Sequence, residues 1–164
     1  VFNNRYRICS FSFPYCLNIS QCITFLNIIK ISNNVDGIHW KEKGVAIILK
    51  KAKDADINDL LRCDGIAIGS PEYFGTMAGM IKDFFDRTYE DAKERTIGKP
   101  FVVFVCAGDD GRGAITQIER IAAGYKWKKV QEHIRIVGVP TKDDLLKLEE
   151  LGQTLAAGVD FGIF

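Results

Sequence analysis

Several features that are common in enzyme and metal sites are scarce in this chain. It contains two histidines, His39 and His133, and no Ser/His/Asp or Cys/His arrangement stands out. Its five cysteines form no Cys-x-x-Cys pair and no compact cluster, so we expect neither a zinc site nor an iron–sulfur centre. We interpret the cysteines as small buried thiols in a reducing compartment.

Charge of one sign is not in excess. The chain has 22 Lys and Arg against 21 Asp and Glu, a net charge of +1, with no basic stripe. This balance gives no reason to expect a nucleic acid partner. The length of 164 residues, with 47% apolar and 26% charged residues, suits one globular domain over 1–164.

Glycine is absent from residues 1–34, and charge is absent from residues 8–29. An uncharged stretch after Arg5 and Arg7 raises the alternative of a signal peptide or membrane anchor. Polar residues inside it, such as Asn18 and Gln21, argue against that alternative. We therefore expect a cytoplasmic protein without membrane attachment.

From residue 44 onward, apolar runs alternate with amphipathic segments. Right-handed βαβ units and a parallel sheet with helices on both faces follow from this alternation. We expect residues 15–20 and 24–43 to supply a degenerate first βα unit, with residues 1–14 as an extension. Five strands then give a doubly wound α/β fold in the order 2-1-3-4-5. The strands are expected at 45–49, 65–69, 101–106 and 134–139, and the helices at 56–61, 76–93, 114–126 and 141–156. We expect Asp54 or Asp56 to cap the first of these helices and Thr141 to cap the last.

The most informative segment is the junction between the strand at 65–69 and the helix that follows it. Pro71 fixes one backbone angle and biases Ser70 away from helix, which predicts a rigid turn. Gly75 allows a backbone conformation that is closed to other residues. Downstream apolar residues recur at spacings of three and four, as on one face of a helix.

Residues 68–77, followed by 82–87, resemble the FMN-binding segment of flavodoxin-like NAD(P)H:quinone and FMN reductases. The resemblance implies a flavodoxin-like sheet and an FMN site, with turn amides facing the polar edge of the flavin. It also implies that Tyr73 or Phe74 packs beside the isoalloxazine ring. The alternative is an ordinary strand-to-helix turn with aromatics in the core. The cofactor-binding residues implied here are Ser70, Pro71, Glu72, Tyr73, Phe74 and Gly75.

A second Gly-rich loop, 107–113, follows the next strand and lies at the same sheet edge. The resemblance implies that Gly108, Asp109 and Gly111 contact the flavin and its ribityl chain. Asp109 and its neighbour Asp110 depart from the family pattern, and a carboxylate there would oppose a reduced anionic ring unless Arg112 compensates. We rank a metal site at the two aspartates, and a nicotinamide-binding Rossmann loop, well below the flavin site.

The phosphate end of the site is the weakest part of the pattern. The family places a Gly-rich loop after its first strand, where backbone amides wrap the FMN phosphate. The nearest equivalents here are Ser20, Thr24 and Asn27, in a segment without glycine. Either divergence or a segment encoded out of frame explains this composition.

We therefore predict an FMN flavoprotein that passes electrons from NAD(P)H to a quinone, a flavin or a protein acceptor. Because the chemistry would belong to the cofactor, we name no catalytic side chain. The resemblance also implies a homodimer or homotetramer. Two alternatives remain: an electron carrier of flavodoxin type without substrate turnover, and a flavodoxin-fold binding or structural protein that has lost FMN.

Overall fold

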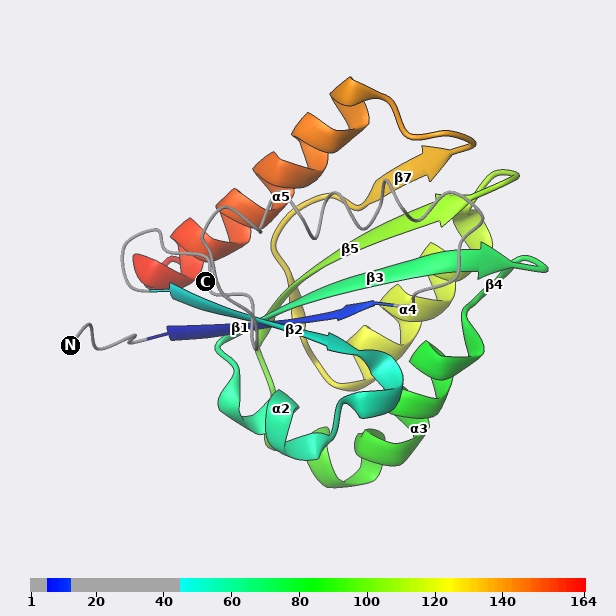
Figure 1. Ribbon diagram of the computed structural model, residues 1–164. Coiled ribbons are helices and arrows are strands. Elements are labelled where there is room, and N and C mark those ends of the chain that lie inside the picture. The colour runs from blue at the N-terminus through cyan, green and yellow to red at the C-terminus, as the bar shows by residue number, and fades with distance from the viewer. Residues whose placement is uncertain (1–5, 13–44) are drawn as a thin grey trace.

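The computed structural model describes residues 6–12 and 45–164, whose strands form one seven-stranded sheet (Figure 1). β-branched and aromatic residues are concentrated in the strand Pro100–Ala107, which is buried along its whole length, as expected for a strand that helices cover on both faces. The strands are β1 (Tyr6–Ser12), β2 (Val45–Lys51), β3 (Gly65–Tyr73), β4 (Thr76–Met77), β5 (Pro100–Ala107), β6 (Lys128–Lys129) and β7 (Ile134–Val137).

The sheet follows the order β2-β1-β3-β5-β6, with parallel pairing along this path. β7 also pairs in parallel with β5, whereas β4 pairs antiparallel with β3. The predicted parallel α/β class is confirmed. The sequence predicted five strands rather than seven, because the hairpin strand β4 and the split of the last strand into β6 and β7 carry no clear local pattern.

The first strand lies earlier than predicted. β1 occupies residues 6–12 and pairs in parallel with β2, from Tyr6 beside Val45 to Ser12 beside Lys51, and also with β3. The prediction of an extension over 1–14 is therefore wrong for residues 6–12. β1 forms because it pairs with strands that lie far along the chain. The local sequence pattern does not reveal such pairing. The strand expected at 15–20 and the helix expected at 24–43 lie outside the described residues.

Helices cover both faces of the sheet. In Figure 1, α5 lies above the strands, whereas α2, α3 and α4 lie below them. Apolar side chains of β3 and β5 alternate between the two layers: Ile68 packs in the core on the α3 and α4 side, and Ala67 in the core on the α5 side. The helices are α2 (Ile57–Arg62), α3 (Gly79–Ala92), α4 (Arg112–Gly124) and α5 (Lys142–Asp160), with the 3-10 turn η1 (Ala52–Asp54) before α2.

Two helices begin at capping boxes that the sequence indicates. The Asp56 carboxylate accepts hydrogen bonds from the amides of Asn58 and Asp59 at the start of α2. The bond from the Asp59 amide lowers the pKa of Asp56. Thr141 and Asp144 form the equivalent box of α5, and the hydrogen bond from the Thr141 hydroxyl lowers the pKa of Asp144. Both caps were predicted, the first as Asp54 or Asp56.

β3 is longer than predicted. Pro71 does not turn the chain; it lies within β3 beside Cys106 of β5. Proline is tolerated there because it lies near the end of the strand, where the ladder with β5 stops. The chain reverses three residues later, so the expected strand-to-helix turn is a β-hairpin that precedes α3.

No helix among the described residues is both long enough and apolar enough to cross a membrane. Cys63 and Cys106 are buried and are not in a disulfide, as the sequence analysis expected for these two thiols.

Candidate functional site

The β3–β4 hairpin projects from the carboxyl edge of the sheet. Phe74 and Gly75 form its two-residue turn, with φ angles of 51° and 72°. Positive φ at both positions is what a hairpin turn of type I′ requires, and it is unfavourable for phenylalanine. The Phe74 side chain is fully exposed, at 104% of its reference area. A strained and exposed aromatic at a sheet edge favours a binding role over a packing role.

Glu72 joins this hairpin to the start of α4. Its two carboxylate oxygens accept hydrogen bonds from the amides of Gly111, at 3.1 Å, and Ala114, at 2.8 Å. The N-cap residue of α4 is Gly111, which has no side chain to supply a cap. A carboxylate from β3 therefore satisfies amides that the helix itself leaves unpaired, at the positive end of its dipole.

Close backbone packing accompanies this bond. A Cβ atom on Gly113 would lie 1.9 Å from the carbonyl oxygen of Gly75. Only glycine allows the first turn of α4 to approach the hairpin this closely. The two predicted loops thus form one connected structure.

The hydroxyl of Ser70 ties the base of the hairpin to α3. The hydroxyl oxygen accepts a hydrogen bond from the Ala78 amide at 3.0 Å, and the O–H group donates to the Pro71 carbonyl oxygen at 2.8 Å. Ser70 is 4% exposed, so its hydroxyl supports the hairpin from inside.

The loop after β5 lies open beside the hairpin, with Gly108, Asp109 and Asp110 exposed. The Asp110 carboxylate accepts the Arg112 amide at 2.9 Å, and the Arg112 guanidinium lies 3.7 Å from it. Arg135 donates to the Asp110 carbonyl at 2.8 Å. The Arg112 side chain thus lies near Asp110, one of the two aspartates that depart from the family pattern.

The two loops offer unused hydrogen-bond donors. Across the described residues, the backbone amides of Phe74, Gly75, Asp109 and Asp110 donate to no other protein group. These exposed amides suit a planar, electron-rich ligand edge. Within the described ranges, no three His, Cys, Asp or Glu side chains gather as a metal site would require.

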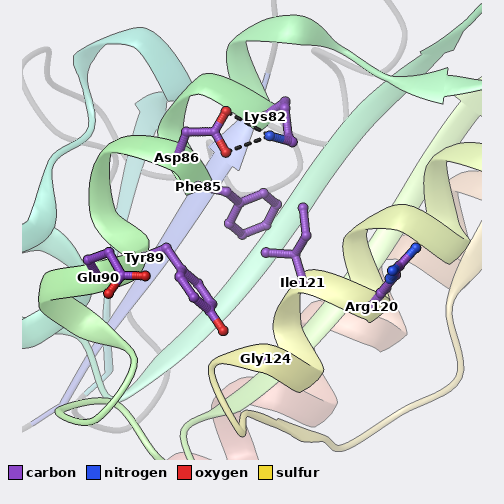
Figure 2. Close-up of a pocket in the computed structure, with 8 residues that line it drawn as sticks. All are labelled: Lys82, Phe85, Asp86, Tyr89, Glu90, Arg120, Ile121 and Gly124. Carbon is purple, nitrogen blue, oxygen red and sulfur yellow. Dashed lines mark hydrogen bonds and ion pairs between the residues drawn. The ribbon is translucent and has the colours of Figure 1, made fainter.

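A separate groove of about 440 Å³ lies between α3 and α4 (Figure 2). Phe85, Tyr89 and Ile121 give it an apolar lining, and Lys82 pairs with Asp86 at 2.7 Å along its side. None of the predicted site residues lines this groove. The hairpin and the loop after β5 remain the better candidate because they carry the exposed donors.

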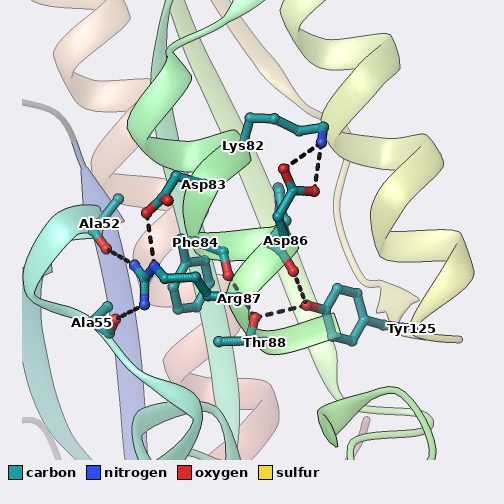
Figure 3. A network of polar contacts seen from close by, with 10 residues as sticks. Ala52, Ala55, Lys82, Asp83, Phe84, Asp86, Arg87, Thr88 and Tyr125 are labelled. Atoms are coloured by element: carbon teal, nitrogen blue, oxygen red, sulfur yellow. Dashed lines mark hydrogen bonds and ion pairs between the residues drawn. The ribbon is translucent and has the colours of Figure 1, made fainter. Parts of the chain in front are cut away.

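Beneath the groove, a buried polar network joins α3 to the end of α4 (Figure 3). The Tyr125 hydroxyl lies 2.8 Å from the Thr88 hydroxyl and 3.2 Å from the Phe85 carbonyl oxygen. Burial raises the pKa of Tyr125 to about 12. The network keeps α3 and α4 in a fixed relation below the two loops.

The guanidinium of Arg87 holds η1 and the start of α2 against α3 (Figure 3). It donates to the carbonyl oxygens of Ala55 at 3.1 Å and Ala52 at 3.2 Å, and its Nε donates to Asp83 at 2.8 Å. Arg87 ends the segment that carries the family resemblance, and its contacts here are structural.

The structure brings the predicted residues of 70–75 and 108–111 together at one edge. It also shows that the side chains of Ser70 and Glu72 bond to protein groups. Ser20, Thr24 and Asn27 lie outside the described residues. Sequence reasoning missed the contact of Gly113 with Gly75 and the capping role of Glu72, because neither the partner of Gly113 nor the cross-element bond has a local signal.

The fold defines a class of protein: a doubly wound α/β domain of flavodoxin type, with the candidate site at the carboxyl ends of the strands. Comparison with known families agrees, because the sequence model of the NADPH-dependent FMN reductases matches residues 35–135. The chain belongs to this family.

Two curated relatives of this chain carry the same description. An NAD(P)H dehydrogenase (quinone) of Acidithiobacillus ferrooxidans is 31% identical over 102 residues, which are 61% of this chain and 49% of the relative. One of Paracoccus denitrificans is 37% identical over 71 residues, 43% of this chain and 34% of the relative. The chain thus matches half or less of the length of these curated relatives.

Among solved structures, a flavodoxin from the domain Archaea superposes with a TM-score of 0.74 at 20% identity. The match covers 93% of this chain and 98% of the flavodoxin. At this identity, the likeness establishes the fold.

Proposed function

We propose that the protein is an FMN-binding oxidoreductase that passes electrons from NAD(P)H to an acceptor. The observation that carries this proposal is the junction at the sheet edge, where Glu72 joins the β3–β4 hairpin to the start of α4 and both loops expose unused amides. Membership of the FMN reductase family supports the same choice of cofactor.

The described residues fit the ring end of FMN. The Phe74 and Gly75 amides would face the polar edge of the ring, with the Phe74 side chain beside it. A Cβ on Gly108 would have no neighbour within 4 Å, so the second loop has room for close approach by the ribityl chain. Ser20, Thr24 and Asn27 stay the proposed partners of the phosphate.

FMN supplies hydride and electron transfer when it is bound. The chain would orient the ring, donate hydrogen bonds where negative charge develops, and exclude water from one side. No side-chain acid or base is needed for this chemistry, so we assign none.

A small-molecule acceptor of the quinone class is the favoured substrate. The two quinone dehydrogenases that this chain resembles support it. Exposed apolar side chains lie at the ends of two strands, with Phe74 in the hairpin turn after β3, Val137 at the end of β7 and Val139 just after it, and they suit an apolar planar acceptor.

The test begins with visible absorption of the purified protein before and after reconstitution with FMN and desalting. We expect a yellow protein that oxidises NADH or NADPH in the presence of a benzoquinone. A protein that stays colourless would overturn the proposal and favour a binding role without cofactor. Light scattering on the same sample checks the predicted homodimer or homotetramer.

The second candidate is an electron carrier of flavodoxin type. Its support is the extent of the structural match, which spans nearly the whole archaeal flavodoxin but half or less of the quinone dehydrogenases. Turnover separates the two candidates. A carrier binds FMN but does not oxidise a nicotinamide at a steady rate.

A further inference from the structure

Two elements that would contact the flavin are held together by one side chain. Glu72 comes from β3, while its two hydrogen-bond donors, Gly111 and Ala114, belong to the start of α4. The residue is half-buried, and its neighbour along the chain, Tyr73, leads directly into the turn with Phe74 and Gly75. Any movement of the hairpin away from α4 must break these bonds.

The contact has little freedom to rearrange. Gly113 lies between the two donor amides in the sequence, and its backbone is close enough to Gly75 that a Cβ would overlap the Gly75 carbonyl. The first turn of α4 therefore abuts the hairpin turn as well as binding its glutamate. Ser70 fixes the base of the same hairpin through the Ala78 amide.

We propose that Glu72 is a positioning residue for the flavin ring: it fixes the Phe74–Gly75 amides by bonding to the N-terminus of α4. This inference rests on the proposed FMN function. Glu72 need not contact the ring itself. Its effect passes through the position of the turn.

Charge and geometry predict opposite results when Glu72 is altered. If only its negative charge mattered, removing it would favour reduced FMN, which is more anionic than oxidised FMN. If its geometry matters, the turn amides lose their fixed position, and reduced FMN, which depends most on those donors, loses the most affinity. The carboxylate is already compensated by two amides and the helix dipole, so we expect geometry to dominate.

Two variants of Glu72 separate these effects. Glu72→Gln keeps the shape and removes the charge, and one of its two terminal atoms becomes an NH2 group that cannot accept from the backbone amide facing it. Glu72→Asp keeps the charge but is one methylene shorter, so it cannot span both amides. The matched control is Asp56→Asn, because Asp56 also accepts two helix amides, those of Asn58 and Asp59, but at α2.

The experiment measures dissociation constants of oxidised and dithionite-reduced FMN by anaerobic titration of the apoprotein. We expect both Glu72 variants to bind oxidised FMN about tenfold more weakly, the loss of one charge-assisted hydrogen bond. Reduced FMN should lose still more affinity, whereas Asp56→Asn should bind both forms as wild type does. Wild-type affinity in Glu72→Asp, or a relative gain for reduced FMN in Glu72→Gln, overturns the inference.

Hydrogen exchange of the proteins without FMN gives an independent readout. Amides of the hairpin and of the first turn of α4 should exchange faster in both Glu72 variants, and those of α2 only in Asp56→Asn. Unchanged exchange in the hairpin would also overturn the inference. A wild-type protein that binds no FMN contradicts the proposed function instead, and exchange then still decides whether Glu72 joins the two loops.

Discussion

Gly113 and Gly75 meet backbone to backbone: a Cβ atom on Gly113 would lie 1.9 Å from the Gly75 carbonyl oxygen. One residue opens α4 and the other closes the hairpin turn, so this contact joins the two walls of the candidate flavin site. Its tightness makes the junction sensitive to a single methyl group.

Gly113→Ala should lower the free energy of unfolding by about 1–3 kcal/mol, because the methyl group overfills a close-packed contact. Urea denaturation measures this difference. Gly79→Ala is the control, since a Cβ there meets nothing within 4 Å and the residue begins α3. We expect that control to be neutral or stabilising by up to about 1 kcal/mol. Equal stability of the two variants would show that the contact between Gly113 and Gly75 can shift to accommodate a methyl group at little cost.

Phe74→Gly should separate binding from stability. Glycine accepts the φ of 51° without strain, so the free energy of unfolding should stay within about 1 kcal/mol of wild type. FMN affinity should fall about three- to tenfold, as expected for the loss of an aromatic contact. Phe161→Ala, an exposed phenylalanine just after α5, is the control for loss of surface aromatic area. If both variants bind FMN like wild type, Phe74 does not pack on the ring.

Tyr125 should make the protein sensitive to alkali. Burial holds the pKa of Tyr125 at about 12, against an ordinary value of 10.0. The unfolded state therefore loses the proton first, and stability falls as pH rises through the window between these values. Tyr125→Phe should remove this dependence, at a cost of about 1 kcal/mol near neutral pH for the lost hydroxyl bonds. Thermal melting from pH 8 to pH 12 tests both parts. If stability still falls steeply at alkaline pH in Tyr125→Phe, groups other than Tyr125 cause the fall.

Arg87→Lys should loosen η1 and α2. A lysine cannot reproduce the fork that donates to the Ala52 and Ala55 carbonyls, so we expect a loss of about 1–3 kcal/mol in unfolding free energy. Arg120→Lys, at an exposed position on α4, should change it by less than about 0.5 kcal/mol. Chemical denaturation of both variants decides the matter. Similar unfolding free energies for the two variants would mean that the Arg87 hydrogen bonds contribute little to stability.

Much of the fold could be read from local pattern. The apolar run at Phe101–Cys106 and the three- and four-residue spacing of Ile81, Phe84 and Phe85 each predict one element, because burial on a sheet or on one helix face imposes that spacing. The caps at Asp56 and Thr141 could be predicted equally well, because capping depends on residues within one helical turn.

What could not be read depends on residues distant in the sequence. Glu72 was predicted as part of a turn that binds cofactor, and its bond to α4 emerges only when β3 and β5 lie side by side. The place of Pro71 within β3 has the same cause, since its pairing with Cys106 extends the strand. Tertiary contact decides such positions, and local propensity does not.

The place of β1 between β2 and β3 has a consequence for assembly of the chain. Tyr6–Ser12 pairs with β2 on one side and β3 on the other, although β2 and β3 are nearer to each other in sequence. Until that segment arrives, β2 and β3 each present an unpaired edge that can recruit a strand from another molecule. Residues 6–12 thus close the gap between β2 and β3. Deleting them should leave the facing edges of both strands open to pairing with another molecule.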